Sequence, residues 1–240
     1  AILDFGQFHA QSTVNLQTRQ ATAIAGFTNV EGFVGSNSFD TIIGADTEIG
    51  YLHRCFEKSC ETHTYQQAIP FTDRLNYMNT MGNNLAYVMA IEKLVDLDVP
   101  PRAQAIRVIL TELQRIASHL VWLGTSGLDL AAMSMFLYCF RERELILDIA
   151  ELCSGQRMMT TYFRPGGLWR DVPVEFETAV REFIKMFPKR IDEYEALLTK
   201  NPLWLDRMLV IGKLDAATAL QHGVTGPTLR ASGVNWDLRK

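Results

Sequence analysis

A short stretch of the chain concentrates side chains that can bind metals or carry redox chemistry. The segment HRCFEKSC, residues 53–60, contains a histidine, two cysteines (Cys55 and Cys60), two basic residues and a glutamate. A structural zinc site needs four ligands, and no second clustered cysteine pair accompanies this one. The tight CxxC spacing of a dithiol redox site is also missing. The residues alone therefore favour cysteines that act as small buried hydrophobes at the start of a helix.

Three other polar side chains stand in apolar surroundings. Asp129 lies two residues after Gly127 and precedes an apolar run, so its carboxylate either caps a helix or is buried and needs a partner. The phenol of Tyr77 can donate a hydrogen bond to a ligand oxygen or to a nearby backbone carbonyl. His119 falls between two apolar positions of a predicted helix, where a satisfied core histidine is more common than a ligand. The local sequence leaves these alternatives open.

The composition excludes several classes of protein. The 240 residues carry a net charge of −4, which argues against a nucleic-acid-binding surface or a polybasic membrane anchor. Four unevenly spaced cysteines do not form a secretory disulfide framework, and no signal peptide is recognisable, so a reducing compartment is expected. The most apolar run, 130–140, is about half the length that spans a bilayer. We therefore expect a soluble globular chain.

The sequence pattern changes near residue 50. Residues 1–50 are rich in Gly, Thr, Asn and Ser and alternate like strands in STVNLQT and ATAIAGF, which predicts a small β region. Residues 51–240 carry long amphipathic patterns and predict a helical domain. The fold class is therefore α+β and mainly α, a helical bundle with a small N-terminal sheet. We expect helices over 84–97, 102–123, 129–152, 174–200 and 215–222, a glycine-bounded link at 124–127, a loop at 164–173 and a turn into a tail at 223–227.

Two of the predicted helices have an assignable core face. In the first, the apolar positions are 85, 88, 91, 94 and 95, and Pro100 and Pro101 stop the pattern. In the second, an apolar stripe runs from Ile106 to Leu120. The polar residues Arg107, Gln114 and Arg115 lie off this stripe, and we expect them away from the core.

Seven separated segments carry a family resemblance when they are taken together. They are IGYLHR, FEKSCETHTYQQAIPFTDRLNY, AYVMAIEKL, PRAQAIRVILTELQRIASHLVWLG, DLAAMSMFLYCFREREL, GQRMMTTYFRPGG and GVTGPTLRASGVNWDLRK. In register from about Ile49 to Lys240, they resemble the D-type subunit of NADH-quinone oxidoreductase (respiratory complex I). This family is related to the large subunit of nickel-iron hydrogenases but has lost its metal-binding cysteines. The resemblance therefore implies a hydrogenase-large-subunit-like fold without a metal.

The resemblance assigns roles to several residues. Arg54, in the family's HRGFEK segment, is implied to lie near the terminal iron-sulfur cluster of a partner subunit, where a fixed positive charge favours the reduced cluster. Arg74 and Met159 are implied to lie near the same cluster. Tyr77 matches the tyrosine that hydrogen-bonds a quinone carbonyl. Asp129 matches the aspartate linked to the quinone-binding histidine and is expected to couple proton transfer.

The chain departs from the family pattern at three places. The family's N-terminal loop reads approximately GPxHPxxHG, whereas FGQFHAQSTV places His9 at the first histidine, Thr13 at the second and Val14 at the glycine. A threonine hydroxyl can donate a hydrogen bond to quinone but cannot act as a protonated base near neutral pH. Met159 replaces a histidine that many members place beside the cluster, which should weaken the pH dependence of its potential. The family also continues well beyond WDLRK, so we expect the family's C-terminal part to be missing.

These features predict the quinone-site subunit of a proton-translocating NADH:quinone oxidoreductase, with no activity of its own. Its expected partners are the subunit that carries the iron-sulfur cluster, other peripheral-arm subunits, membrane-arm subunits and quinone as substrate, with no cofactor bound by this chain. We expect it peripherally on the cytoplasmic face of a bacterial inner membrane or on the mitochondrial matrix side. One alternative is a homologous subunit of a ferredoxin- or F420-dependent or hydrogenase-like membrane complex. Thr13, Val14 and Met159 motivate another, an assembly subunit that has lost quinone chemistry.

Overall fold

The computed structural model describes residues 50–237 together with five short strands nearer the N-terminus. The chain divides into two compact units, residues 54–201 and residues 1–53 with 202–240. The predicted division into domains at residue 50 stays a prediction. The predicted positions of His9 and Thr13, with Val14 beside them, lie outside the described residues.

The N-terminal strands pair antiparallel in two small sheets. They are β1 (Asn15–Leu16), β2 (Thr28–Asn29), β3 (Phe33–Ser36), β4 (Phe39–Ile42) and β5 (Asp46–Thr47). One sheet has the order β1-β4-β3, with Asn15 opposite Thr41 and Phe33 opposite Ile42. The other pairs β2 with β5. The small β region that the sequence predicted is therefore present.

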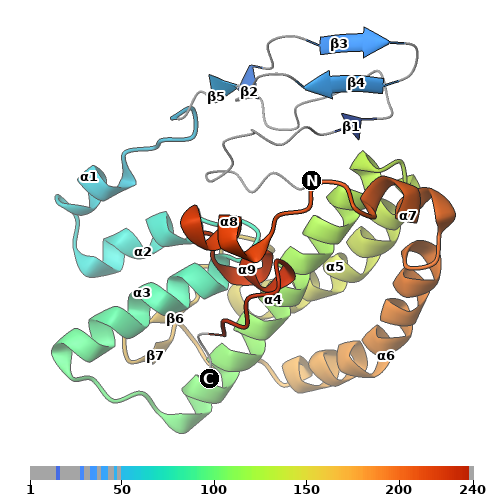
Figure 1. Cartoon of the computed structure of the whole chain (residues 1–240). Helices are drawn as coiled ribbons and strands as arrows, with labels where there is room; N and C mark the ends of the chain where they lie inside the picture. Colours follow the sequence, from blue (N-terminus) through green and yellow to red (C-terminus); the bar gives the residue numbers. More distant parts are fainter. Residues whose placement is uncertain are drawn as a thin grey trace. The chain divides into compact units, whose positions relative to one another are not determined.

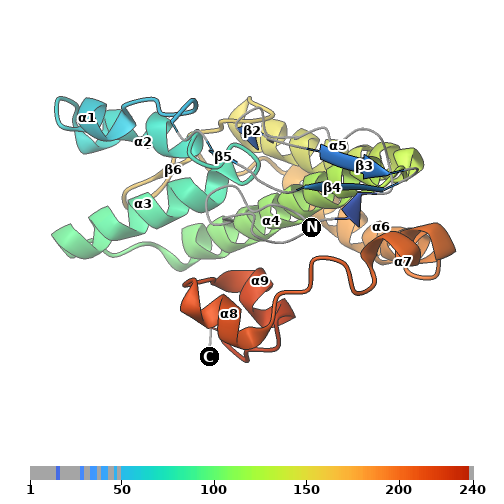
Figure 2. The same ribbon diagram turned by 45° about the horizontal axis from the view of Figure 1, so that its top comes forward.

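The unit over residues 54–201 is a layer of helices in which neighbours in the sequence pack against each other (Figure 1). Its elements are α1 (Phe56–Cys60), α2 (Tyr65–Asp73), α3 (Thr80–Val95), α4 (Pro101–Asp129), α5 (Met133–Ser154), β6 (Phe163–Arg164), β7 (Gly167–Leu168) and α6 (Glu175–Leu198). Helices α4 and α5 lie side by side along most of their length in both views (Figure 2). A β6–β7 hairpin follows α5 and packs against α3 and α4. The predicted mainly α fold is confirmed.

The ends of these helices follow from local chemistry. Thr64 caps α2 in a capping box with Gln67, each side chain accepting a hydrogen bond from the other residue's backbone N–H. Pro101 opens α4, where its missing N–H costs nothing and its fixed φ suits the first helical position. Gly155 ends α5 in the left-handed region with φ 80°.

The sequence predicted a link at 124–127, and this prediction is wrong, because these residues are part of α4. A Cβ on Gly124 would lie 3.3 Å from the Cβ of Cys139, and one on Gly127 would lie 3.0 Å from the Cβ of Met135. These glycines therefore let α5 approach α4 closely instead of breaking the helix. The turn comes later, where Ala131 adopts φ 68° and Ala132 donates its N–H to the carbonyl of Gly127.

The predicted core faces of α3 and α4 need correction. Arg107 and Gln114, expected away from the core, are buried. On α3 the buried positions include 81, 84, 88, 91 and 92, whereas Leu94 and Val95 are exposed. The helix begins four residues earlier than its apolar pattern suggested, because Thr80 and Asn84 are polar but face inward. Burial on α3 and α4 thus includes polar side chains that need partners.

The C-terminal segment forms short helices of its own. Helices α8 (Ala216–Gln221) and α9 (Gly226–Ala231) pack around Ala219, Val224 and Leu229. The tail predicted from 223–227 is therefore wrong, because Gly226 and Pro227 begin a helix instead of ending the fold. Helix α7 (Pro202–Met208) precedes this pair.

Candidate functional site

The loop between α2 and α3 presents Tyr77 on a fixed backbone. The side-chain oxygen of Asn76 accepts the backbone N–H of Met78, and its backbone carbonyl accepts from the backbone N–H of Asn79 and the side-chain amide of Asn83. The Tyr77 side chain is 50% exposed, and its hydroxyl makes no hydrogen bond to another described residue. A half-exposed phenol with an uncommitted hydroxyl can serve as a hydrogen-bond donor to a bound molecule.

Asp73, the last residue of α2, is the buried carboxylate nearest to this loop in sequence. Its side chain is fully buried, and its Oδ2 accepts hydrogen bonds from the backbone N–H and the hydroxyl of Thr161, at 2.7 and 2.8 Å. Burial raises the pKa of the Asp73 carboxyl above its usual range, while the two Thr161 hydrogen bonds and the charges of Arg74 and Arg164 act in the opposite direction. Asp73 therefore ties the end of α2 to the segment before β6.

That segment contains two residues in the left-handed region. Met159 has φ 54° and Thr161 has φ 47°, a conformation that costs residues with a Cβ roughly 1–2 kcal/mol each. Tyr162 and Phe163 follow and are fully buried, and Phe163 donates its backbone N–H to the side chain of Asn84. The segment is thus strained but held on both sides by buried contacts.

The structure brings Met159 and Arg74, both expected beside a partner's cluster, into one neighbourhood. Arg74 follows Asp73 directly, and Met159 lies two residues before the threonine that Asp73 binds. The Arg74 guanidinium donates to the carbonyl of Pro70 and so caps the end of α2. The Met159 side chain is half-buried.

Arg54 lies at the entry to α1, on the surface of the same unit. Its guanidinium is exposed and pairs with no other described residue. Cys55 is also exposed and adopts φ 53°, a left-handed conformation that glycine, the residue the resemblance implies here, adopts without steric cost. The interpretation of Cys55 and Cys60 as buried hydrophobes is wrong, since only Cys139 and Cys153 are buried, with pKa values raised by burial to about 12.

Asp129 is the last residue of α4, not the first of the next helix. Neither of its predicted local roles holds, because it cannot cap an N-terminus from there and it is exposed, not buried. Partial desolvation raises the pKa of its carboxyl, and within the described part of the chain it has no salt-bridge or hydrogen-bond partner. A carboxylate at a helix C-terminus is electrostatically unfavourable, so local helix stability does not account for an aspartate at position 129.

The start of α3, three residues after Tyr77, and the end of α4, at Asp129, point toward the same end of the α3–α4 pair but are offset along it. Glu92 of α3 contacts Arg107 of α4, and the five-residue connection between the helices makes them antiparallel neighbours. At 1.5 Å per residue, the start of α3 lies about 18 Å from Glu92 and the end of α4 about 33 Å from Arg107. In Figure 1, α4 continues past the start of α3 in this direction.

Sequence reasoning missed the buried charged residues. Arg107 forms a two-pronged pair with Glu92, with N–O distances of 2.6 and 3.0 Å, and also donates to the carbonyls of Arg164 and Gly167. Glu92 in turn accepts the backbone N–H of Gly166. The only sequence signal for this buried ion pair was that one predicted amphipathic helix carries a carboxylate and the next one carries a guanidinium. His119, expected in the core, is exposed on α4.

Two negative findings concern the described residues. Among residues 50–237, no three histidine, cysteine, aspartate or glutamate side chains gather as a metal site would require. None of the helices described has both the length and the apolar character needed to cross a bilayer.

Comparison with known proteins supports the resemblance found in the sequence. Residues 129–240 match the family of the 49 kDa subunit of respiratory-chain NADH dehydrogenase. The chain is 60% identical over 201 residues to a D-type subunit of NADH-quinone oxidoreductase from Roseiflexus castenholzii, covering 84% of this chain and 48% of that protein. It is 57% identical to another such subunit, from Chloroflexus aurantiacus, over 84% of this chain and 49% of the relative. The chain spans about half the length of the curated relatives it matches.

Proposed function

Because this chain is a homologue of the D-type subunits of NADH-quinone oxidoreductase, we propose that it is the quinone-site subunit of a proton-translocating NADH:quinone oxidoreductase. It would act beside an iron-sulfur cluster held by a partner subunit, together with other peripheral-arm and membrane-arm subunits. We expect it on the cytoplasmic face of a bacterial inner membrane or on the matrix side in mitochondria. The observation that carries the quinone assignment is the uncommitted, half-exposed phenol of Tyr77 on a fixed loop.

Quinone reduction creates a specific demand that these residues can meet. Two-electron reduction builds negative charge on two carbonyl oxygens, and a donor at each end stabilises this charge and delivers protons. Tyr77 would donate at one end. Asp129, with its raised pKa, can hold a proton closer to neutral pH than an ordinary aspartate does. The other donor would come from the region of His9 and Thr13, where Thr13 offers a hydroxyl in place of an imidazole.

The cluster-facing side of the proposed site is formed by cations and a strained segment. The exposed guanidinium of Arg54 would favour the reduced, more negative form of a neighbouring cluster and so raise its reduction potential. Arg74 adds a second charge near Met159. Because Met159 cannot be protonated, the potential should depend less on pH than it would beside a histidine.

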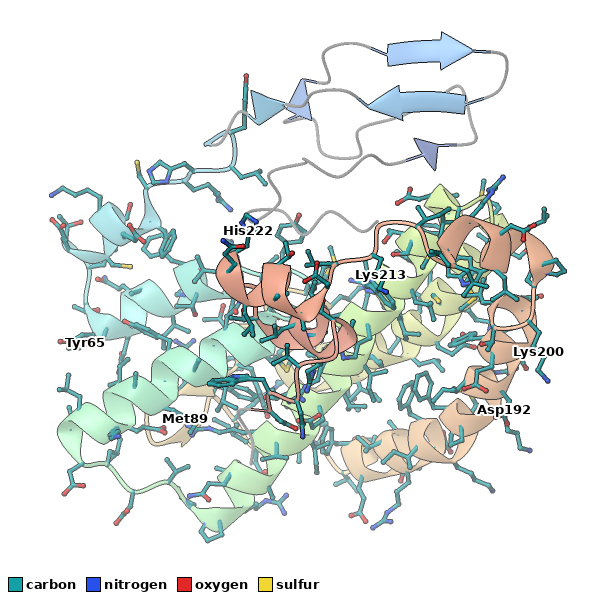
Figure 3. The ribbon with its side chains drawn as sticks, viewed as in Figure 1. Tyr65, Met89, Asp192, Lys200, Lys213 and His222 are labelled. Carbon is teal, nitrogen blue, oxygen red and sulfur yellow. The ribbon has the colours of Figure 1, made fainter. Side chains whose placement is uncertain are left out.

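The test is Tyr77→Phe in the assembled complex. Loss of one hydrogen bond to developing negative charge should lower quinone reductase activity by roughly 10- to 100-fold. NADH should still reduce the iron-sulfur chain, as followed by electron paramagnetic resonance. Tyr65→Phe is the matched control, because Tyr65 is an exposed tyrosine at the start of α2, well separated along the chain (Figure 3). Unchanged quinone kinetics in Tyr77→Phe would remove Tyr77 from the site.

The same complex separates this function from a purely structural role. The assembly alternative rests on Thr13, Val14 and Met159, the positions at which the chain departs from the family pattern. A quinone-site inhibitor should protect the 74–79 loop from hydrogen exchange if the site binds quinone. Absence of protection there, with a fully assembled complex, would favour the assembly role.

A further inference from the structure

The segment from Met159 to Phe163 contains a conformation that its own sequence does not favour. Met159 and Thr161 both have positive φ, although neither is glycine or asparagine, and they are separated by a single residue. Such strain persists only where surrounding contacts fix the backbone. The contacts that fix Thr161 are therefore the ones that determine where Met159 points.

Asp73 supplies those contacts. Both of its hydrogen bonds go to Thr161, one to the backbone N–H and one to the hydroxyl, and they converge on a single oxygen, Oδ2. The other oxygen, Oδ1, is buried and has no partner among the described residues. Burying a carboxylate without an ion-pair partner costs free energy, so its presence at this place calls for a role that compensates the cost.

Stability alone does not require Asp73 at this place. Asn84 already anchors the segment through the backbone N–H of Phe163, and Glu92 anchors the hairpin through the backbone N–H of Gly166. Both anchors lie on α3 and hold residues with ordinary or glycine conformations. Asp73 is the anchor of the strained pair itself.

We propose that Asp73 is a positioning residue: by binding Thr161 it holds the Met159–Thr161 segment in its strained conformation and sets the environment of the redox centre that a partner subunit presents to Met159. This inference rests on the proposed function, which puts Met159 beside that centre. Asp73 does not touch the reacting groups. It acts through the backbone that it fixes, from the residue adjacent to Arg74 and four residues before Tyr77.

The first measurement asks whether Asp73 fixes the segment and needs no assumption about function. Asp73→Asn replaces the carboxyl oxygen that accepts both hydrogen bonds from Thr161 by one oxygen of a neutral amide, so hydrogen exchange of the 157–163 peptide in the intact complex should become about tenfold faster. Thr161→Ala should give a smaller increase because the backbone N–H still binds. Thr161→Ser keeps both the backbone N–H and the hydroxyl donor, so exchange should stay as slow as in the wild type. Unchanged exchange in Asp73→Asn would overturn the proposal.

The second measurement asks whether the segment matters to the redox centre. The electron paramagnetic resonance spectrum and midpoint potential of the terminal cluster should change in Asp73→Asn, less in Thr161→Ala and not in Thr161→Ser. Glu92→Gln is the matched control, since Glu92 is a buried carboxylate that also accepts one backbone N–H but from Gly166, beyond the strained pair. It should lower the melting temperature without altering the cluster signal.

The outcomes distinguish this inference from the proposed function. Faster exchange with an unaltered cluster signal would overturn the positioning role while leaving the quinone-site assignment intact. An equal change of the signal in Glu92→Gln would reduce Asp73 to a structural residue. A wild-type complex without any iron-sulfur subunit would overturn the proposed function itself, and the positioning role with it.

Discussion

Two buried carboxylates hold the same stretch of chain in opposite ways. Glu92 accepts two hydrogen bonds from Arg107 and one from the backbone of Gly166, so its charge is paired and both oxygens are satisfied. Asp73 accepts two hydrogen bonds on one oxygen from a strained residue, and none of its hydrogen bonds comes from a cation. The contacts of Glu92 therefore stabilise the fold, whereas the buried Asp73 carboxyl lowers stability in order to hold one particular backbone conformation.

The same contrast extends to other polar groups in these segments. At the start of α3 and beside Thr161, the hydroxyls of Thr80 and Thr160 and the side-chain amide nitrogen of Asn84 are buried without partners among the described residues. At the Glu92 end, the carbonyls of Arg164 and Gly167 both receive hydrogen bonds from Arg107, and only the hydroxyl of Thr111, one turn further along α4, is buried without a partner among the described residues there. Unsatisfied buried polar groups are uncommon in proteins, and they are expected at functional sites or where a binding partner would supply the missing hydrogen bonds. The Asp73 end is therefore where we expect function to reside.

The largest expected effect is at the paired end. Arg107→Ala leaves Glu92 as a buried charge without its cation and three hydrogen bonds to backbone carbonyls unmade, so the free energy of unfolding should fall by about 3–5 kcal/mol. Chemical denaturation of the full chain, followed by circular dichroism, measures this. Arg102→Ala is the control, because its ion pair with Asp171 is exposed and screened by solvent. A comparable loss in both variants would contradict the contrast between buried and exposed pairs.

The next effect tests the packing of α5 against the far end of α4, away from the paired carboxylate. Gly127→Ala would place a Cβ 3.0 Å from the Cβ of Met135, so either α5 or the side chain must move. We expect a loss of about 1–3 kcal/mol in the free energy of unfolding. Gly155→Ala tests the other way a glycine can be needed, because Gly155 has open space around it but a positive φ. If Gly127→Ala were neutral in chemical denaturation, the glycines of α4 would not explain the close approach of α5.

These glycines also show how far the sequence could lead. The periodicity of the long amphipathic helices was enough to predict most of them, because a single apolar face decides their position. Two glycines three residues apart are equally compatible with a turn and with a helix face that packs closely against another helix. Only the close approach of Cys139 and Met135 in the structure distinguishes the two. The link predicted at 124–127 failed for this reason, and Asp129 was consequently placed at the wrong end of a helix.

The sequence offers candidates for the site where local motifs name them, but it does not reveal the contacts between residues far apart in the chain. Tyr77 and Arg54 became candidates because their local segments resemble a family, and their roles stay predictions. Arg107 was predicted to lie off the core because charge was taken as exposure, and its partners, at 57 and 60 residues' distance along the chain, leave no local pattern. Asp73 was missed likewise, since Thr161 lies 88 residues away.

A smaller change in the free energy of unfolding, a gain instead of a loss, is expected at Cys55, another residue in the left-handed region. Cys55 has φ 53°, a conformation that glycine adopts without steric cost. Cys55→Gly should raise the free energy of unfolding by roughly 0.5–1 kcal/mol, because the relief of strain exceeds the extra entropy that glycine gives the unfolded chain. Thermal unfolding of the full chain measures it. Cys60→Gly, within α1, should be destabilising instead, and a gain in both variants would refute the role of the left-handed conformation.

The smallest effect is confined to a pH window and depends on Asp73. Burial raises the pKa of its carboxyl in the folded chain above the ordinary value of 3.8 that it regains on unfolding. Between these two pH values the folded chain binds more protons than the unfolded chain, so this residue makes stability fall as pH rises. Below the window Asp73 is protonated in both states, and above it the penalty of the buried charge is constant. Asp73→Asn should lack this decline when melting temperatures are compared across the window.

Thr161 sharpens the test because its hydroxyl acts on the same equilibrium. The hydrogen bonds from Thr161 favour the charged carboxylate and oppose the effect of burial on the pKa. Thr161→Ala should therefore raise the pKa of Asp73 further and extend the decline in stability to higher pH, while Thr161→Ser should leave it in place. If the decline were equally absent from the wild-type chain, the Asp73 carboxyl would be no more costly to ionise than an exposed one, and the contrast with Glu92 would lose its electrostatic basis.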